Sequence, residues 1–503
     1  MLYTKVLNCK SKGRIKLAIT NFASGINTIA DENVTPFKYA KCSYNFNHKS
    51  GALKQSYGFS DLCLPTTSIS ALPTRKIIIP EDIGGIQGAW IYRFVDESEN
   101  NERVHYIVFY AGNKHFYYTR LFSTDPEIGV LPYICEFTEC PTVVNFRVDG
   151  IDSLIFTSPA EGMYIWKGYI FPFEIEGAPA LSSMCVHYER IFGTSADSEK
   201  NSVLFSDDLN PLNWNQSLSE GGFIQMLDEA GPLNKVISFL DYVYVIRDFG
   251  IARITAYAEQ EEFAVTQLFV TSGKIYHKTA CLCGNRIMFL AQDGLYSFDG
   301  VSTKKIDTGL ENFFKSFKND KSFAAYHDGK YYLACYLEYG DGKVVGCENT
   351  EGYINNSLIE FDIASGTYSI VRGVDILSLW SIQDDSASVL AVCFRDEFNV
   401  RVGQLDDSGK FFGTNTIKRW VSPFSDLGYP ENIKIIREIH FLAKYDCKVI
   451  ITTDTETREF NVVGKTAVTK LRTNIKGSLI KIEFECEGEA AYISNAHIII
   501  DLK

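Results

Sequence analysis

The side chains that most often carry catalysis or bind metals lie scattered in this sequence. The eight histidines never stand two or four positions apart, the spacings that place a metal-binding pair on one strand or one helix face. The closest cysteines, Cys281 and Cys283, have no second pair at zinc spacing. The sequence also lacks a G-x-S-x-G, H-E-x-x-H or Walker A motif. We therefore expect no catalytic residue, no metal site and no cofactor, in a protein that is not an enzyme.

The arrangement nearest to a catalytic one is a polar run that contains Ser206, Asp207, Asn210, Pro211 and Trp214. Paired carboxylates could serve glycoside cleavage, and the run loosely resembles the Asp-box turn of sialidase propellers. It departs from that turn because its Trp is one position late, Asn210 replaces a Gly, and the run occurs once. We interpret it as a structural turn.

Two Asp-Gly pairs also indicate turns. In Asp293-Gly294 and Asp299-Gly300 the glycine supplies the positive φ that tight hairpins need. Neither pair requires a catalytic role.

A dense aromatic group, Tyr164, Trp166, Tyr169 and Phe171, follows the strand-turn-strand pattern EGMYIWKGYIFPF. Alternation along a strand turns some of these rings outward, where they could stack on sugars. Packing in the core is the favoured interpretation.

Composition favours β structure over other classes. The chain has 503 residues, of which 46% are hydrophobic, 14% aromatic and 22% charged. This argues against disorder, and aromatic residues suit pleated, half-buried surfaces. The net charge of −13 disfavours specific nucleic-acid binding and anionic membranes. The thirteen cysteines are too sparse for a disulfide scaffold and predict folding in a reducing compartment.

A repeated pattern of a turn followed by an aromatic, β-branched strand predicts the architecture. Seven such starts lie between residues 101 and 384, spaced by about 47 residues, the size of one propeller blade. Each is usually followed by a second strand. We therefore expect an all-β fold with a six- or seven-bladed β-propeller.

The two ends of the chain differ from this pattern. Residues 1–80 are rich in Asn, Ser and Gly and predict an extended N-terminal arm or a blade-closing segment. Residues 81–417 are expected to form the propeller, with one short helix where Thr308 and Glu311 have capping-box spacing. Residues 418–503 alternate cleanly and predict a C-terminal β-sandwich.

The sequence begins without the apolar core of a secretory signal and contains no run of 18 apolar residues. We expect synthesis in the cytoplasm and no membrane insertion.

Three stretches together resemble the β-propeller nozzle and tail-tube-extension proteins of short-tailed bacteriophages. The first matches their opening, roughly N-F-x-G-G-x-N followed by Pro, Asn and G-x-L-x-x-x-x-G, and departs from it at Ala23-Ser24. The second is similar to their S-D-x-x-N-P-x-N-W segment, and the third to a blade hairpin. The residues that carry the resemblance are Asn21, Phe22, Gly25, Asn27, Asn45, Gly51, Gly58, Ser206, Asp207, Asn210, Pro211, Trp214, Asp293, Gly294, Asp299 and Gly300.

The resemblance implies a structural subunit of a virion tail, made in the cytoplasm of a host bacterium. Such proteins form homo-oligomeric rings, commonly hexamers, below the portal and the tail adaptor, and DNA passes through the lumen without specific binding. The acidic total suggests a lumen that repels DNA, which a neutral or basic lumen in the assembled ring would contradict. The alternatives are a carbohydrate-binding or glycoside-cleaving propeller that acts as a receptor-binding tail protein, and an intracellular WD-like scaffold. The sequence lacks recurring Trp-Asp and Gly-His pairs, which weakens the second alternative.

Overall fold

A computed structural model gives the structure of the protein. It describes residues 14–19, 21–31, 35–68, 73–96, 102–130, 137–168, 171–196, 201–218, 221–256, 260–306, 308–314, 318–349, 353–384, 387–396 and 399–503. The fold is all-β, and the described residues form one four-residue α-helix, α1 (Glu311–Phe314), beside short 3-10 turns.

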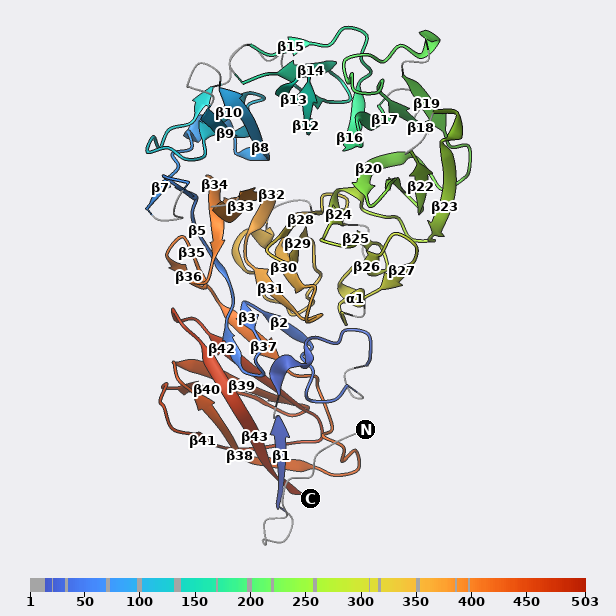
Figure 1. Ribbon diagram of the computed structural model, residues 1–503. Helices are drawn as coiled ribbons and strands as arrows, with labels where there is room; N and C mark the ends of the chain where they lie inside the picture. Colours follow the sequence, from blue (N-terminus) through green and yellow to red (C-terminus); the bar gives the residue numbers. More distant parts are fainter. Residues whose placement is uncertain are drawn as a thin grey trace.

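Seven sheets, antiparallel except for one parallel pairing in the last, follow one another along the chain and stand side by side in a ring, the arrangement of a β-propeller (Figure 1). Neighbouring sheets contact each other mostly through their first strands, and the contact of β32 with β8 closes the circle. The strands of the first four sheets are β8 (Ile86–Asp96), β9 (Glu102–Ala111), β10 (Phe116–Arg120), β11 (Gly129–Val130); β12 (Thr142–Val148), β13 (Ile151–Thr157), β14 (Met163–Trp166), β15 (Phe173–Glu174); β16 (Leu181–His187), β17 (Arg190–Ser195), β18 (Ser202–Phe205), β19 (Gly222–Gln225); and β20 (Leu233–Phe239), β21 (Tyr242–Arg247), β22 (Gly250–Thr255), β23 (Ala264–Val270). Those of the last three are β24 (Cys281–Leu282), β25 (Ile287–Ala291), β26 (Gly294–Phe298), β27 (Thr303–Lys305); β28 (Phe323–His327), β29 (Lys330–Cys335), β30 (Ser357–Asp362), β31 (Tyr368–Arg372); and β32 (Asp375–Asp384), β33 (Ala387–Asp396), β34 (Asn399–Asp406), β35 (Lys410–Phe411), β36 (Thr414–Asn415).

The last of these sheets takes a strand from near the start of the chain. Strand β5 (Gly58–Asp61) lies between β34 and β35, antiparallel to the first and parallel to the second. Gly58 is required there, because a Cβ atom on it would lie 2.2 Å from the carbonyl oxygen of Lys410. A neighbouring pair, β6 (Cys63–Pro65) and β7 (Thr74–Lys76), then leads into β8.

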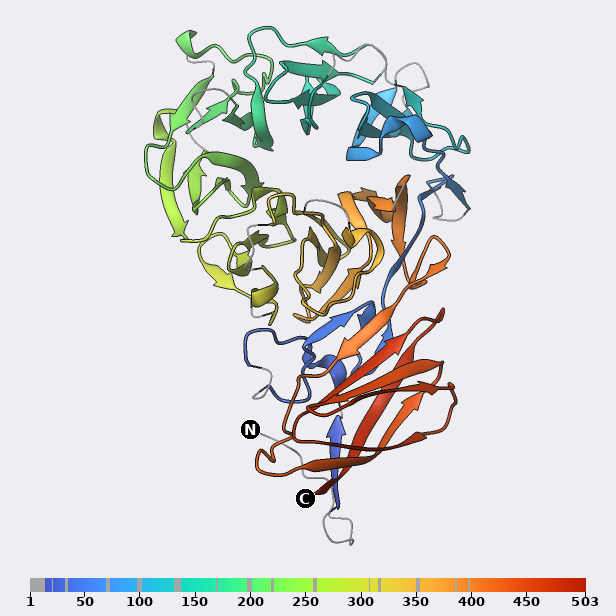
Figure 2. The same ribbon diagram turned by 180° about the vertical axis from the view of Figure 1, so that it is seen from behind.

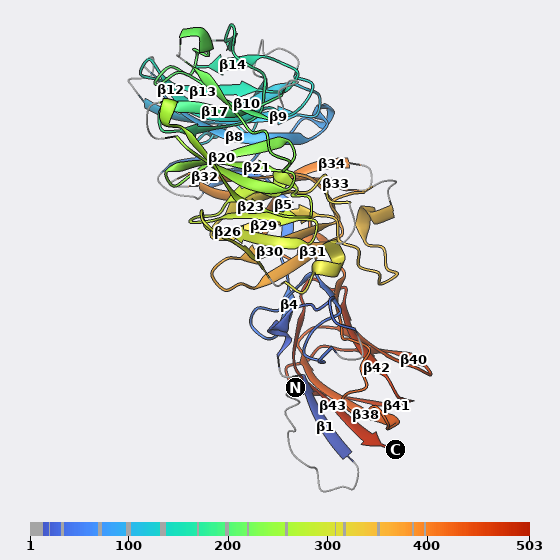
Figure 3. The ribbon, with the colours of Figure 1, turned by 90° about the vertical axis from the view of Figure 1, so that its right-hand side faces the viewer.

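Two further sheets form a second domain beside the ring, which we call the two-sheet domain (Figures 2 and 3). One sheet contains β1 (Arg14–Ile19), β3 (Phe46–Asn47), β4 (Leu53–Gln55), β38 (Lys434–Ala443), β41 (Thr469–Gly477) and β43 (Tyr492–Leu502). The other contains β2 (Cys42–Tyr44), β37 (Lys418–Val421), β39 (Cys447–Thr453), β40 (Thr457–Val462) and β42 (Ile480–Cys486).

The sequence predicts an extended N-terminal arm or a blade-closing segment over residues 1–80. In the described part of that segment, β5 joins the last ring sheet and the strands before it lie in the two-sheet domain. Strands β1, β2, β3 and β4 pair with β43, β37 and each other inside the two-sheet domain. The apolar side chains of this segment are buried, as Phe22, Tyr44 and Leu53 show with exposures of 1% or less. A segment that buries such side chains gains more by packing than by reaching out as a free arm.

One hydrophobic core runs from the ring into the two-sheet domain. It includes Tyr331 and Ile370 of the sixth ring sheet together with Trp420, Phe441 and Phe484 of the two-sheet domain. Because the same cluster is shared, the two domains pack as one unit along this face.

Candidate functional site

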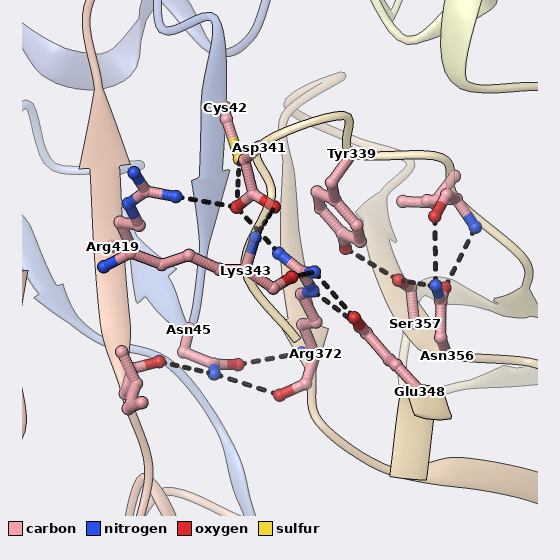
Figure 4. A network of polar contacts seen from close by, with 12 residues as sticks. Cys42, Asn45, Tyr339, Asp341, Lys343, Glu348, Asn356, Ser357, Arg372 and Arg419 are labelled. Atoms are coloured by element: carbon pink, nitrogen blue, oxygen red, sulfur yellow. Dashed lines mark hydrogen bonds and ion pairs between the residues drawn. The ribbon is translucent and has the colours of Figure 1, made fainter. Parts of the chain in front are cut away.

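A network of buried charges lies where the sixth ring sheet meets the two-sheet domain (Figure 4). At its centre is Arg372, the last residue of β31, which is 2% exposed. Its Nε donates to Glu348 Oε1 at 2.6 Å, its Nη2 to Glu348 Oε2 at 2.7 Å, and its Nη1 to Asp341 Oδ2 at 3.0 Å. Arg372 and Glu348 therefore form a bidentate ion pair, in which the planar guanidinium matches both carboxylate oxygens.

Two tyrosine rings surround the same guanidinium. The Arg372 Cζ atom lies 3.9 Å from the ring centroid of Tyr339, in the ring domain, and 4.6 Å from that of Tyr44, in β2. Burial by itself lowers the pKa of Arg372, but the hydrogen bonds to Glu348 and the charges of its neighbours together outweigh burial and raise that pKa. The cation is thus held charged in a desolvated place, where contacts with aromatic faces are strongest.

Asp341 connects the two domains directly. Its Oδ2 accepts from Arg372 Nη1 at 3.0 Å and from Arg419 Nη1, in β37, at 2.7 Å. Arg419 also pairs with Glu483 of β42, and Cys42 Sγ lies 4.0 Å from Asp341 Oδ2. Burial, and then the charge of Asp341, raise the pKa of the Cys42 thiol to about 12, so the thiol stays protonated.

The acidic partners come from residues 336–356, a long insertion between β29 and β30 that carries the 3-10 helix η8 (Gly346–Asn349). Lys343 of the same insertion pairs with Glu485 of β42. Buried ion pairs of this kind fix geometry more than they add stability, because desolvation offsets their attraction. The insertion therefore connects the ring to the two-sheet domain through ion pairs on both sides.

Asn45 is the neutral part of the same junction. Its Nδ2 donates to the carbonyl oxygens of Arg372 at 3.0 Å and Ile417 at 2.8 Å, and its Oδ1 accepts from the Arg372 N–H at 2.9 Å. The Asn45 N–H donates to Ile370 O at 2.8 Å. With φ of 57° the residue is left-handed, a conformation that Asn tolerates better than most side chains.

The other residues of the first motif pack next to this junction. The Asn21 side chain accepts from the Ala23 N–H at 2.8 Å and caps η1 (Phe22–Ser24). A Cβ atom on Gly51 would lie 2.9 Å from Asn21 Oδ1, and the Gly51 carbonyl accepts from the Phe22 N–H. The Phe22 ring packs edge-on against Trp420, with 5.1 Å between centroids.

Gly25 and Asn27, also of the first motif, line a cavity of about 370 Å³. The cavity lies between the first motif and the ring. Gly25 has φ of 75°, and Asn27 Oδ1 accepts from the Ile29 N–H. The hydroxyl of Tyr368, in β31, accepts from the Ile26 N–H at 3.0 Å and donates to the backbone carbonyl of Thr308. The Tyr368 contacts tie this motif to the ring.

The second motif is a turn between β18 and β19 in the third ring sheet. The Ser206 hydroxyl accepts from the Ile191 N–H at 3.0 Å, and the Asp207 N–H donates to the Asn213 carbonyl. Asn210 Oδ1 accepts from the Leu212 N–H, and Trp214 Nε1 donates to the Pro211 carbonyl at 3.0 Å. These hydrogen bonds hold residues 206–214 as a turn.

The third motif lies in the fifth ring sheet, far along the chain from the other two. Asp293 accepts from the Tyr296 hydroxyl at 2.6 Å, and Gly294 has φ of 142°. Asp299 accepts from the backbone N–H groups of two following residues, which lowers its pKa, and Gly300 has φ of 99°. The three motifs are not brought together into one site.

The aromatic group divides between core and surface. Trp166 is 2% exposed and Tyr164 packs against the same cluster, whereas Phe171 is 60% exposed. Tyr169 lies outside the described residues.

The charged residues of the junction were not predicted from the sequence. The available signal was the length of the segment 336–356, because an insertion of this length between two paired strands exceeds an ordinary hairpin loop.

Among the described residues, no group of three or more His, Cys, Asp or Glu side chains is placed to hold a metal ion. In the same part of the chain, no helix is long and apolar enough to cross a membrane.

The sequence matches no family model and no curated protein. Among solved structures it is similar to BBS1N from its complex with ARL6DN, in crystals soaked with lead, at 8% identity and a TM-score of 0.38, covering 69% of this chain and 97% of that chain. BBS1N from the same complex, in crystals soaked with mercury, is similar at 8% identity and a TM-score of 0.36, covering 70% of this chain and 99% of that chain. The N-terminal domain of Nup159 is similar at 9% identity and a TM-score of 0.31, over 52% of this chain and 74% of that chain.

Proposed function

We propose that the chain is a seven-bladed β-propeller joined to a β-sandwich, and that it is a structural subunit of a phage tail. In this proposal, several copies of the chain assemble into the nozzle or a tail-tube ring below the portal and the adaptor. The central channel of this assembly is closed at first and later lets DNA leave the particle. The protein is made in the host cytoplasm and acts in the virion tail.

The observation that supports this proposal best is the position of the first motif. Asn21, Phe22, Gly25, Asn45 and Gly51, by which the sequence resembles tail proteins, all lie at the junction of the two domains. A tail subunit must keep its two domains in a fixed orientation while DNA passes. Motif residues at the domain junction are expected to serve this purpose. Chemistry on a substrate would instead require polar groups that converge on an open cleft.

The charge supports the same proposal. A net charge of −13 disfavours tight contacts with phosphates, so DNA would slide past and not bind. Partners would be further copies of the chain, in a ring we take to be a hexamer, the tail adaptor and other tail proteins.

Electron microscopy of the purified chain, alone and mixed with the tail adaptor protein, tests the proposal. We expect closed rings seated on the adaptor, with the propeller and the sandwich both resolved. Monomers that remain monomers with the adaptor present would contradict it.

A second candidate function is carbohydrate binding by a receptor-binding tail protein. It is favoured by Phe171 and Phe173, which are 60% and 42% exposed near the outer edge of the second ring sheet. Exposed aromatic faces can stack on sugar rings. Glycan-array binding that is lost in Phe171→Ala, but retained in Val301→Ala at another exposed apolar position (74%), would support it.

A further inference from the structure

Two cysteines face each other across neighbouring strands of the two-sheet domain. Strands β39 and β42 are antiparallel, and Lys448 pairs with Glu485. The next position of this register places Cys447, the first residue of β39, opposite Cys486, the last residue of β42. Both are free thiols in the apolar core, with exposures of 7% and 1%.

This arrangement matches the geometry of a disulfide. Directly opposite residues in an antiparallel pair have Cβ atoms about 4.5–5.5 Å apart and point to the same face. A disulfide needs Cβ atoms about 3.5–4.5 Å apart, so a small closing movement of the two strand ends is enough. Cys447 also pairs with Val462 of β40, and Cys486 with Lys418 of β37, so these two outer strands must follow the movement.

A small oxidant can reach one of the two thiols. A cavity of about 270 Å³ opens at these strand ends, lined by Cys447 and by Asp446, Val462, Glu485 and Gly488 among others. Cys486 does not line it. Its hydrogen bond with Cys447, and then burial, raise the pKa of Cys486 well above its usual range. Because Cys447 lines the cavity and Cys486 does not, Cys447 is the thiol that a small oxidant reaches first.

We propose that Cys447 and Cys486 are a modification site, a dithiol that a peroxide converts into a reversible disulfide. The Cys447 thiolate attacks one oxygen of hydrogen peroxide, the O–O bond breaks, and hydroxide leaves, so that Cys447 becomes a sulfenic acid. The Cys486 sulfur then attacks Cys447 Sγ and loses its proton, and the sulfenic oxygen leaves as water. Two thiols lose two electrons in total, and one peroxide is reduced to two molecules of water.

Peptide mapping of the full chain tests this inference. The reduced, folded protein is treated with hydrogen peroxide, alkylated, unfolded and digested with trypsin, which separates residues 445–448 from residues 482–503. We expect these two peptides to appear linked, with loss of both alkylated forms, and to separate again after treatment with dithiothreitol.

The matched variants are Cys447→Ser and Cys486→Ser, which should abolish the linked peptide, and Cys335→Ser, another buried cysteine, which should leave it unchanged. The unsubstituted chain suffices for the test if a variant fails to fold. The inference is overturned if both cysteines remain reduced in the folded, peroxide-treated chain. It is equally overturned if Cys447 accumulates as sulfinic acid without any link to Cys486.

Discussion

Asn45 and Arg372 form a reciprocal pair of hydrogen bonds across the domain junction: the Arg372 N–H donates to Asn45 Oδ1 at 2.9 Å, and Asn45 Nδ2 donates to the Arg372 carbonyl at 3.0 Å. The side-chain amide thereby replaces the backbone of a neighbouring strand at the end of β31. It satisfies backbone groups that would otherwise be buried without partners.

Replacing this amide should loosen the junction. Asn45→Ala removes three buried hydrogen bonds and places a residue that disfavours positive φ at φ of 57°. We expect a loss of about 2–4 kcal/mol in the free energy of unfolding, measured by urea titration followed by tryptophan fluorescence.

Asn45→Gly separates the two causes. Glycine accepts the backbone conformation but lacks the amide, so this variant should lie between the wild type and Asn45→Ala. Equal stability of Asn45→Gly and the wild type would mean that the amide contributes nothing to the junction.

The Arg372–Glu348 pair should be strongly coupled. Arg372→Met leaves the Glu348 carboxylate without its buried cation and Asp341 with Arg419 alone, and should cost about 3–5 kcal/mol. In a double-mutant cycle with Glu348→Gln, we expect a coupling energy of about 1–3 kcal/mol.

The exposed pair Lys274–Asp320 supplies the comparison. Its atoms lie 3.1 Å apart, but the side chains are 42% and 62% exposed. The cycle of Lys274→Met with Asp320→Asn should therefore give less than about 1 kcal/mol. Similar coupling in both cycles would show that burial of the junction does not strengthen its ion pairs.

Stability should also fall in mild acid because of His48. Burial, and then the charge of Lys49, lower its pKa from 6.5 to about 4. Between these values the unfolded chain binds more protons than the folded chain, so the free energy of unfolding is greatest above pH 6.5. It should decrease as the pH falls toward 4, by at most about 3 kcal/mol.

His48→Gln should flatten this part of the pH profile when unfolding is measured at several pH values. His115→Gln, at an exposed position, serves as the control and should keep the wild-type slope. An unchanged slope in His48→Gln would mean that other groups cause the acid sensitivity.

Gly58→Ala should open the last ring sheet. The added methyl would lie 2.2 Å from Lys410 O and 2.5 Å from Lys410 N, both backbone atoms that cannot turn away. We expect β5 to lose its place beside β35, seen as faster amide hydrogen exchange in residues 58–61 and 403–411. Ser60→Ala, in the same strand, should leave exchange nearly unchanged, and normal exchange in Gly58→Ala would rule out this close approach as a constraint.

The strand repeat could be found in the sequence because one strand of each ring sheet carries most of the signal. The seven predicted starts precede β9, β13, β17, β21, β25, β29 and β33, which are the second strands of the seven sheets. These strands are nearly continuous apolar runs, as in β25, where every residue from Ile287 to Ala291 is buried. The first strands line the middle of the ring, and their sequences mix buried residues with partly or fully exposed ones, so the repeat pattern does not detect them. Each sheet therefore begins one strand earlier than the pattern indicated.

The N-terminal strands and the junction could not be predicted in the same way. Cys42 pairs with Val421 and Leu53 with Ile493, so the partners lie hundreds of positions away and the strands are too short for a periodic pattern. Asp341 and Glu348 lie in an irregular polar segment, and nothing local indicates that Arg372 will meet them. Only tertiary packing brings these residues together.

The pairing of β1 with β43, and of β5 with β34, also constrains the order of biosynthesis. Residues 14–19 are translated early, yet their hydrogen-bonding partners are residues 496–501. The ribosome must therefore pass almost the whole sequence before either domain can complete its sheets. Until then the early strands need shielding from other nascent chains, because unpaired strand edges promote aggregation.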